Sequence, residues 1–277
     1  MTPRPVSWLP GAPEWPAFSP YQLHLALALC LGLVLVMGAP ALARVHRSRL
    51  LAVTLAAALG GLAAGLWLPW LVAGMPPFES PAELPLVAYA GVAGGLPAAL
   101  AIAWALSVPW RPLLDALAPA AALGLAVARA GCFLAGCDYG VPSGAWASLR
   151  YPAWAFPGEV RASSAALADH LARALVPPDA SMSQPVHPVQ LYESLLGLGL
   201  FGVLVTFGPR RDGLRVWVLA VGYGVGRFLL ELLRGDEDRG VRLLGTPWST
   251  SQLVSIGVVA LAGLAIGWRI SHRKRLG

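Results

Sequence analysis

Long apolar stretches, separated by short polar connections, run along almost the whole chain. The hydrocarbon core of a bilayer is about 30 Å thick, so a helix that crosses it needs about 20 mainly apolar residues. In lipid a segment must satisfy its own backbone polar groups, and the alternating pattern of a membrane β-barrel is absent. The sequence therefore predicts an all-α, polytopic integral membrane protein with about seven transmembrane helices, at residues 20–42, 50–74, 84–108, 112–137, 187–208, 214–234 and 249–268.

One connection is much longer than the others. Residues 138–186 separate the fourth and fifth predicted helices and are rich in Pro, Ser and Ala. Within them, residues 163–175 have the pattern of a short amphipathic helix that can lie at a membrane surface. We therefore expect a single integral membrane domain over residues 1–277, with an external insertion between spans four and five.

The composition supports a membrane protein and excludes other classes. The 277 residues are 57% hydrophobic and only 12% charged, with a mean hydropathy of +0.64, whereas soluble domains carry about 25% charged residues. Gly and Pro are abundant but lie within and between apolar runs, which argues against disorder. A net charge of +6 would suggest a nucleic-acid partner in a soluble protein. Here the cations cluster at the ends of apolar stretches, so no nucleic-acid partner is expected.

The positions of these basic clusters predict the orientation. Short loops rich in Lys and Arg face the cytoplasm, and such residues follow the first, third, fifth and seventh spans: Arg44, Arg47, Arg49, Arg111, Arg210, Arg211, Arg215, Arg269, Arg273, Lys274 and Arg275. The opposite connections carry acidic residues, namely Glu79, Glu83 and residues 236–238. The N-terminus is therefore predicted to lie outside and the C-terminus in the cytoplasm.

An alternative is that the first span is a cleaved signal peptide. Residues 41–43, Ala-Leu-Ala, resemble a signal-peptidase site that follows an apolar stretch. However, the preceding segment begins with five prolines, two tryptophans and a single cation, Arg4, before the apolar run. Cleavage would also place Arg44 and its basic neighbours outside, against the charge pattern of the other loops. We therefore expect the first span to remain.

Ionisable residues inside the apolar stretches are the candidates for function. A charged side chain at the centre of a membrane helix costs about 2.5–3.5 kcal/mol, so it usually faces a cavity or a partner. At 100° per residue, one narrow face of the sixth span carries Tyr223, Arg227, Glu231 and Arg234. Two arginines against one glutamate predict a net positive stripe that can hold the phosphate of a lipid headgroup. The alternative is an internal salt-bridge ladder.

Two further polar groups lie at the ends of neighbouring spans. Arg129 lies near the end of the fourth span, where it either meets a partner or extends to the interface. His187, Gln190 and Glu193 lie within an arc of about 120° at the start of the fifth span. Capping is the alternative role for Gln190 and Glu193, but Glu193 is deep enough to need a cation, either Arg129 or Arg227. All three groups are expected in the outer half of the membrane, where they can meet in one cavity.

The three cysteines, Cys30, Cys132 and Cys137, are too few for a disulfide scaffold and lack the spacing of a zinc site, so no metal is expected. On a continuous helix Cys132 and Cys137 lie about 140° apart, which places them poorly for a shared ligand. Packing against Gly131 and Gly136 is the first interpretation. The second is a disulfide, which requires the helix to break at Gly136.

Taken together, these residues resemble the prolipoprotein diacylglyceryl transferase family of bacterial inner membranes. Residues 187–193, His-Pro-Val-Gln-Leu-Tyr-Glu, are similar to its H-P-S-Q-L-Y-E motif. Residues 223–234 match its Y-G-x-x-R-F-x-x-E-x-x-R stretch at every specified position, including Phe228. Residues 129–131 fall on its G-R-x-G-N-F motif. Gln252, in the last predicted span, matches a glutamine that the family carries there. The order of these motifs agrees over residues 20–265, so the combination is specific although each motif alone is weak.

The resemblance implies an enzyme that moves an sn-1,2-diacylglyceryl group from phosphatidylglycerol to the thiol of the lipobox cysteine in a prolipoprotein signal peptide, forming a thioether and releasing glycerol 1-phosphate. It implies a multi-pass protein of the bacterial inner membrane, with the insertion in the periplasm and no cofactor. Positive charge near the phosphate stabilises the departing anion, so the catalytic residues implied are Arg129, Arg227, Arg234, Glu231 and Tyr89. The substrate-binding residues implied are Tyr223, His187, Gln190, Tyr192, Glu193 and Gly131.

The chain departs from the family pattern at the acceptor end of the site, as a divergent member would. Tyr89 takes the position of a histidine, and a tyrosine with the ordinary pKa of about 10 is a poor base at neutral pH. Cys132 and Ala135 replace asparagines, and Cys137 replaces a glutamate. Two alternatives follow: a relative with a different acceptor, and a non-catalytic membrane protein that binds anionic lipid. A third hypothesis, that the protein is an ion channel or proton carrier, is supported only by the intramembrane charges.

Overall fold

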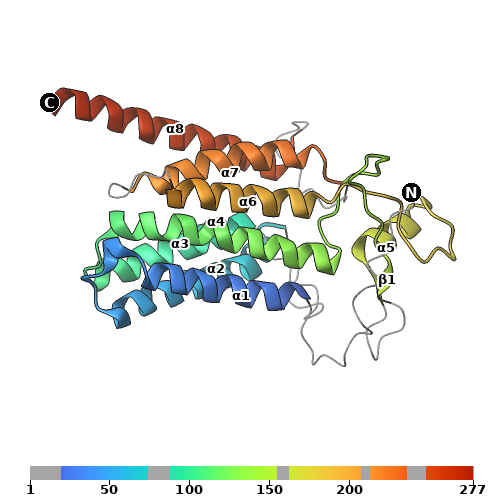
Figure 1. The fold of residues 1–277 in the computed structure, drawn as a ribbon, viewed down its shortest axis with the longest axis horizontal. Coiled ribbons are helices and arrows are strands. Elements are labelled where there is room, and N and C mark those ends of the chain that lie inside the picture. The colour runs from blue at the N-terminus through green and yellow to red at the C-terminus, as the bar shows by residue number, and fades with distance from the viewer. Residues whose placement is uncertain (1–19, 74–87, 155–161, 207–212, 236–247, 277) are drawn as a thin grey trace. The chain divides into compact units, whose positions relative to one another are not determined.

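Helices make up nearly all of the regular structure in the computed structural model of the protein, which describes residues 20–73, 88–154, 162–206, 213–235 and 248–276 (Figure 1). In chain order the elements are α1 (Pro20–Met37), η1 (Pro40–Leu42), α2 (Arg47–Ala73), α3 (Ala88–Ala105), α4 (Trp110–Ala135), β1 (Ala153–Trp154), β2 (Ala162–Ser163), α5 (Ala165–Ala172), α6 (Val189–Thr206), α7 (Arg215–Glu231) and α8 (Thr250–Leu276). Each of the seven apolar stretches coincides with one of the helices α1 to α4 and α6 to α8, although α8 continues to Leu276, beyond the predicted end of the last span. The expected amphipathic helix is α5.

Four helices among the described residues are long and apolar enough to cross a membrane, with spans Arg47–Trp67, Trp110–Leu134, Val189–Thr206 and Thr250–Arg269. Shorter apolar segments lie in α1 and α3, at Tyr21–Met37 and Gly91–Ala105. Large hydrophobic side chains on several helices are exposed, among them Val34, Leu59 and Leu264. Such surfaces are unfavourable in water and suited to lipid. The protein therefore has the features of a polytopic helical membrane protein. Several residues used to predict its orientation, namely Glu79, Glu83, Arg210, Arg211 and residues 236–238, lie outside the described residues.

The chain divides into two compact units, each of which is described separately. Unit 1 consists of Met1–Ala28, Ala122–Gly202 and Trp217–Gly277, and unit 2 of Leu29–Ala121 and Val203–Val216. The core of unit 2 includes Val36, Val53 and Leu113. Its helices α2 and α3 approach closely at glycines, because a Cβ atom on Gly60 would lie 2.6 Å from the Cβ atom of Ala98. Small residues of this kind are typical of close helix packing in membranes.

A buried carboxylate in unit 2 satisfies the start of α7. Asp115, on α4, accepts hydrogen bonds from the backbone amides of Gly213 (3.0 Å) and Arg215 (3.1 Å). The first amides of a helix have no partner within the helix and carry a partial positive charge, so an acidic cap stabilises them. The burial of Asp115 is thus explained by this structural role.

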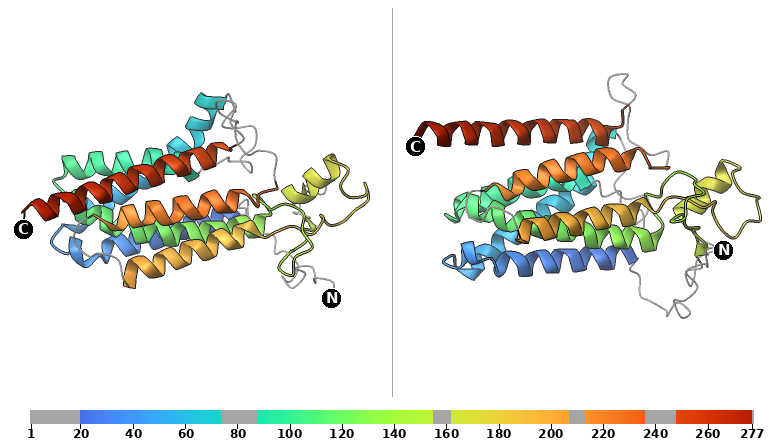
Figure 2. Two further views of the ribbon diagram at one scale, coloured as in Figure 1. Left: turned by 90° about the horizontal axis from the view of Figure 1, so that it is seen from above. Right: turned by 45° about the horizontal axis from the view of Figure 1, so that its top comes forward.

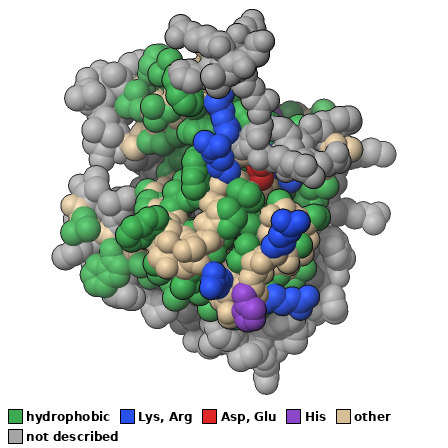
Figure 3. Space-filling model, turned by 90° about the vertical axis from the view of Figure 1, so that its left-hand side faces the viewer, with side chains coloured by type: hydrophobic (Ala, Val, Ile, Leu, Met, Phe, Trp, Pro, Cys, Tyr) green, Lys and Arg blue, Asp and Glu red, His purple; other side chains and the backbone are tan. Residues whose placement is uncertain are grey.

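Basic side chains are exposed between the end of α1 and the first turn of α2. Arg44, Arg47 and Arg49 all lie at the surface of unit 2, as does Arg111 at the start of α4. Figure 3 shows Lys and Arg side chains on one face of the molecule, among hydrophobic side chains. The exposure of these arginines agrees with their expected role in orienting the protein.

The long insertion is a folded part of unit 1. Strands β1 and β2 pair in antiparallel register, with Ala153 opposite Ser163. The side chain of Ser164 caps α5 by accepting a hydrogen bond from the Leu167 amide, 3.4 Å. Beneath these elements lies a small core of Tyr139, Tyr151, Ala166 and Val186. Figure 1 shows α5 and β1 beyond the ends of α4 and α6, the two helices that the insertion joins.

Helix α4 ends two residues earlier than the expected span, and its end has a defined geometry. Gly136 has a φ of +73°, a conformation that favours glycine. The Gly136 amide donates to the Phe133 carbonyl and the Cys137 amide donates to the Cys132 carbonyl, both at 3.2 Å. These two bonds form a Schellman motif, which satisfies the last carbonyls of a helix. Helix α4 is therefore stopped at a defined point by local backbone bonds.

Candidate functional site

Six charged side chains form a continuous ion-pair network within unit 1. Arg129, near the end of α4, pairs through Nε with Glu193 Oε2 on α6 at 2.9 Å, and also pairs with Asp138. The other oxygen of Asp138 lies 2.7 Å from Nη2 of Arg234. Arg129 is 9% exposed and Glu193 only 2%, so this is a buried pair. The alternative in which Arg129 extends to the interface is thereby excluded.

The network continues along α7. Arg227 Nη2 lies 2.6 Å from Glu231 Oε2, and Arg227 Nε lies 4.0 Å from Glu193 Oε1. The Tyr223 hydroxyl donates a hydrogen bond to the same Glu193 oxygen, at 2.9 Å. Glu193 is therefore the junction of the network, because one of its oxygens meets α4 and the other meets α7. The expectation that Glu193 pairs with Arg129 or Arg227 is confirmed for both.

Small residues bring the helices of the network close enough for these contacts. Between α6 and α4, a Cβ atom on Gly197 would lie 2.9 Å from the Ala122 carbonyl oxygen. The Ser194 hydroxyl donates to the Ala126 carbonyl at 2.8 Å, which joins the same two helices. Between α6 and α7, the side chain of Leu196 leaves no room for a Cβ atom on Gly226. Figures 1 and 2 show α6 and α7 side by side.

Arg234 reaches the network from a turn and not from the helix face that the sequence predicts. Helix α7 ends at Glu231, and the following residues pair with the segment after α4. The Val141 amide donates to the Leu233 carbonyl at 2.8 Å, and the Gly235 amide donates to the Tyr139 carbonyl at 3.0 Å. These backbone bonds hold Arg234 beside Asp138.

The expected net positive stripe is corrected by the structure, because the charges of the network balance. Three arginines, Arg129, Arg227 and Arg234, meet three carboxylates, those of Asp138, Glu193 and Glu231. The partner that the sequence does not reveal is Asp138, because it lies in the predicted external insertion. Burial raises the pKa of the Asp138 carboxyl, but the charges of Arg129 and Arg234 outweigh burial and lower the pKa to about 2. Asp138 is therefore ionised at neutral pH.

One buried donor of the network has no partner among the described residues. Nη1 of Arg227 is buried and makes no hydrogen bond, while Nη2 of the same side chain donates to the Ser251 hydroxyl at 3.3 Å. Leaving a buried donor unsatisfied costs about 1–3 kcal/mol, and more for a charged group. An anion beside Arg227 would satisfy this donor and form a charge-assisted hydrogen bond.

Ser251 is held in place by the cap of α8. The Ser249 hydroxyl accepts from the Gln252 amide at 3.2 Å, and the Gln252 side chain accepts from the Ser249 amide at 3.1 Å. This reciprocal pair is a capping box. Gln252, noted in the sequence for its place in the last span, thus fixes the first turn of α8 and the serine that contacts Arg227.

The comparison with known proteins identifies the family. Residues 16–268 match the family described as prolipoprotein diacylglyceryl transferase. The chain belongs to this family. It is similar to the phosphatidylglycerol–prolipoprotein diacylglyceryl transferase of Burkholderia cenocepacia (strain HI2424), with 35% identity over 189 residues, or 64% of this chain and 61% of the relative. The protein of the same name from Geobacter sulfurreducens is 32% identical over 190 residues, covering 67% of this chain and 62% of the relative. The matches thus span about three fifths of these relatives' length.

Three family-motif residues, Gln190, His187 and Tyr192, lie at or just before the start of α6, outside the ion-pair network. The Gln190 side chain is buried and donates to the Cys137 carbonyl, which ties α6 to the end of α4. This contact replaces the capping role considered for Gln190. His187 Nδ1 and the Tyr192 hydroxyl lie 3.3 Å apart and form a local pair.

Gly131 and Tyr89 lie in other surroundings. A Cβ atom on Gly131 would lie 2.5 Å from the Cβ atom of His24 and 3.2 Å from the Cα atom of Tyr21. Glycine at 131 therefore allows α1 to approach α4 closely, and this packing role accounts for the residue. Tyr89 is half-buried at the second position of α3 and belongs to unit 2, whereas the network belongs to unit 1.

The structure also corrects the expected separation of Cys132 and Cys137. Because α4 ends before Cys137, the spacing of a continuous helix does not apply, and the ligand atoms of Cys132, Cys137 and Asp138 all lie within 4.8 Å of one another. This group is poorly suited to a metal cation. Asp138 is already paired with two arginines, and Arg129 Nη1 lies 4.0 Å from Cys132 Sγ.

Proposed function

We propose that this protein transfers an sn-1,2-diacylglyceryl group from phosphatidylglycerol to the thiol of a prolipoprotein lipobox cysteine. The observation that carries the proposal is the buried, unsatisfied Nη1 of Arg227 within a network of three arginines. Its chemistry fits the phosphate of an anionic lipid. Membership of the prolipoprotein diacylglyceryl transferase family supports the same substrate class.

In the reaction, the acceptor thiolate attacks the terminal glyceryl carbon that is bonded to the phosphate oxygen. A carbon–sulfur bond forms, the carbon–oxygen bond breaks, and glycerol 1-phosphate leaves with the electron pair. Arg227 binds the phosphate, with Arg129 and Arg234 adding positive charge near the departing oxygen. Such preorganised charge stabilises the transition state more than the ground state.

The carboxylates of the network hold the arginines in position. Glu193 contacts both Arg129 and Arg227, and the Tyr223 hydroxyl fixes one Glu193 oxygen. Asp138 holds Arg129 and Arg234 together from the opposite side. Orientation of this kind matters because a guanidinium group binds a phosphate well only in a defined geometry.

We place the protein in the bacterial inner membrane with seven spans, an external N-terminus and a cytoplasmic C-terminus. The insertion over residues 138–186 then lies in the periplasm, on the same side as the end of α4. The exposed arginines that follow α1 support this orientation. In this arrangement the network is reached from the outer leaflet and from the periplasm, where the acceptor thiol is presented.

Reconstituted proteoliposomes test the proposed activity. Vesicles containing phosphatidylglycerol labelled in its acyl chains are incubated with the full-length protein and a peptide that carries a lipobox cysteine. We expect label on the peptide thiol, and a loss of about 100-fold or more in the Arg227→Ala variant. The Arg47→Ala variant removes an exposed arginine outside the network and serves as the matched control, with a rate close to wild type.

The outcomes separate the alternatives. Labelled peptide with wild type but not with Arg227→Ala supports the transferase. Label transferred only to a different thiol compound indicates a relative with another acceptor. No product with any thiol, together with retained binding of phosphatidylglycerol vesicles that Arg227→Ala weakens, would show that the protein binds anionic lipid without catalysis.

A further inference from the structure

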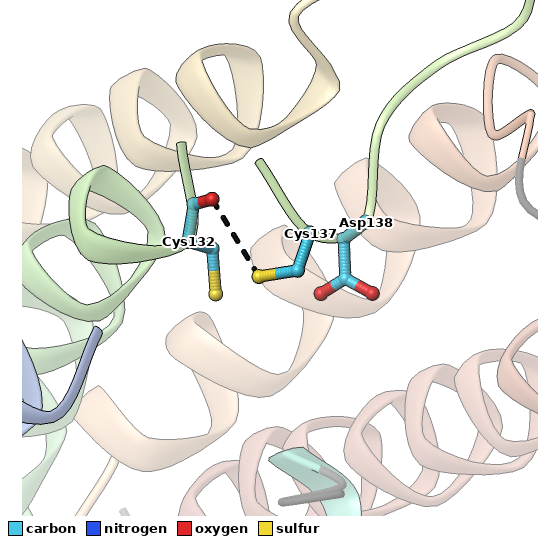
Figure 4. Close-up of side chains that lie close together, drawn as sticks. All are labelled: Cys132, Cys137 and Asp138. Carbon is cyan, nitrogen blue, oxygen red and sulfur yellow. Dashed lines mark hydrogen bonds between the residues drawn. The ribbon is translucent and has the colours of Figure 1, made fainter. Parts of the chain in front are cut away.

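Two free thiols lie side by side at the end of α4. Cys132 is in the last turn of the helix and is buried, whereas Cys137 follows the Schellman turn and is half-buried. Figure 4 shows both sulfur atoms on the same side of the turn, with the Asp138 carboxylate next to Cys137. The Cys137 thiol donates to the Cys132 carbonyl at 3.5 Å. The proposed transfer reaction uses neither thiol.

The turn itself creates this proximity. On a continuous helix the two side chains would point in different directions, but the positive φ of Gly136 ends the helix between them. The backbone bond from the Cys137 amide to the Cys132 carbonyl fixes the two residues relative to one another. The sulfur atoms lie within 4.8 Å of each other, so rotation of the side chains has to close the remaining separation to the S–S length of about 2.05 Å.

The surroundings favour a thiol reaction over metal binding. Cys137 can be reached from outside because it is only half-buried. Arg129 Nη1 lies 4.0 Å from Cys132 Sγ, and a neighbouring positive charge stabilises the Cys132 thiolate, which is the nucleophile that closes an intrachain bond to Cys137. The same positive charges oppose a metal cation.

We propose that Cys132 and Cys137 form a reversible intrachain disulfide, a modification site separate from the transfer chemistry. The oxidant is a small disulfide such as oxidised glutathione. The Cys137 thiolate attacks one sulfur of the oxidant, forming a mixed disulfide and releasing one thiol. The Cys132 thiolate then attacks Cys137 Sγ, forming the intrachain bond and releasing the second thiol. The protein loses two hydrogen atoms and the oxidant is reduced to two thiols.

The bond would reinforce the part of the site where three contacts meet. The Cys137 carbonyl accepts from Gln190 of α6, and the next residue, Asp138, bridges Arg129 and Arg234. A covalent link from Cys132 to Cys137 therefore holds the end of α4 in the conformation that the network needs. The disulfide also lowers the conformational entropy of the unfolded chain, and this stabilises the folded protein.

Mass spectrometry of the full-length protein in lipid nanodiscs tests the proposal. The Cys30→Ala background leaves only the two thiols in question. The protein is equilibrated in buffers with reduced or oxidised glutathione, denatured under acid quench and treated with a maleimide tag. We expect two tags in the reduced buffer, and in the oxidised buffer no tag and an intact mass lower by two hydrogen atoms. Thermal unfolding is expected to shift upward by about 2–4 °C on oxidation.

Single substitutions show the order of the two steps. With Cys132→Ser in the oxidised buffer, we expect a stable glutathione adduct on Cys137, because the second thiol is missing. With Cys137→Ser, we expect Cys132 to remain taggable, since it is buried. The proposal is overturned by two tags in the oxidised buffer, by a glutathione adduct that persists when both thiols are present, by a bond that joins only separate chains, or by a bound metal that depends on both cysteines.

Discussion

Asp138 connects two arginines that are far apart in the sequence. Its two oxygens meet Arg129 of α4 and Arg234 of the turn after α7. Without this carboxylate the network would contain three arginines and two glutamates, and Arg234 would lose its partner there. An unpaired buried charge is far more costly than a paired one. Asp138 is thus the residue that makes a group of buried arginines tolerable in the absence of substrate.

The Asp138→Asn variant is expected to lower stability in a pH-dependent way. The folded pKa of about 2 lies below the ordinary value of about 3.9. The ionised carboxylate therefore stabilises the fold above the unfolded pKa, and this stabilisation is lost as the pH falls toward 2. Because the carboxylate is partly solvated, we expect a loss of about 1–2 kcal/mol at pH 6. Thermal unfolding of the detergent-solubilised protein measures it.

The control for this prediction is to compare the thermal unfolding of wild type and Asp138→Asn at lower pH as well. The difference between wild type and Asp138→Asn should shrink as the pH is lowered from 5 to 2, because the wild-type carboxylate becomes protonated. A difference that stays constant over this range would mean that the carboxylate does not stabilise through its charge.

At the scale of single residues, the sequence predicts which charges belong to the site but not how they pair. The depth of Glu193 in an apolar stretch indicates that it needs a cation, and Arg129 and Arg227 supply it. The sequence does not indicate that Asp138 needs a partner, because Asp138 follows the apolar stretch and belongs to the predicted insertion. Its role depends on the turn that ends α4 and places its carboxylate beside Arg129 and Arg234, and such geometry is not encoded in hydropathy.

At the scale of elements, the ends of α4 and α7 matter more than the helices themselves. The apolar pattern predicts seven helices, and each predicted stretch contains one. Hydropathy does not predict that α4 ends at Ala135 or that α7 ends at Glu231, because local backbone bonds determine those ends. Those ends, however, position Asp138 and Arg234, so the site depends on two turns that the apolar pattern does not reveal.

Replacing Gly136 should test the importance of the turn after α4. The Gly136→Ala variant places a side chain at a φ of +73°, and its Cβ atom would lie 3.0 Å from the Ser164 Cβ atom. Both effects oppose the turn, so we expect a loss of about 1–3 kcal/mol in stability and a fall in the proposed transferase activity as Asp138 shifts. Thermal unfolding and the proteoliposome assay measure the two effects.

The Gly144→Ala variant provides the control for this experiment. Gly144 lies in the same insertion, and a Cβ atom there would meet nothing within 4 Å. We expect its stability and activity to match wild type. Equal behaviour of the two alanine variants would show that the conformation of Gly136 is not needed.

At the scale of the whole molecule, the charge asymmetry between connections predicts the orientation. The exposed arginines after α1 and the insertion after α4 should lie on opposite sides of the membrane. Family membership covers residues 16–268, which includes every residue of the network. Under the proposed function, the orientation decides from which side lipid and acceptor would reach that network.

Cysteine labelling tests the orientation. In a background without native cysteines, Ser48→Cys places an exposed thiol in the first turn of α2, and Gly144→Cys places one in the insertion. A membrane-impermeant maleimide added to intact spheroplasts should label the protein only when the cysteine is at 144. Inside-out vesicles should give the reverse pattern. Labelling of both positions from the same side would contradict the topology.

The sequence order of the ion-pair network also bears on how the protein enters the membrane during synthesis. Arg129 and Asp138 lie nine residues apart, and Arg227 and Glu231 lie four apart, so each of these pairs is neutral within a single emerging segment. Glu193 differs, because α6 contains no basic residue. By the time α6 leaves the ribosome, however, α4 has already been made and carries Arg129. Each charge therefore arrives either together with an opposite charge or after one, which lowers the free-energy barrier to insertion.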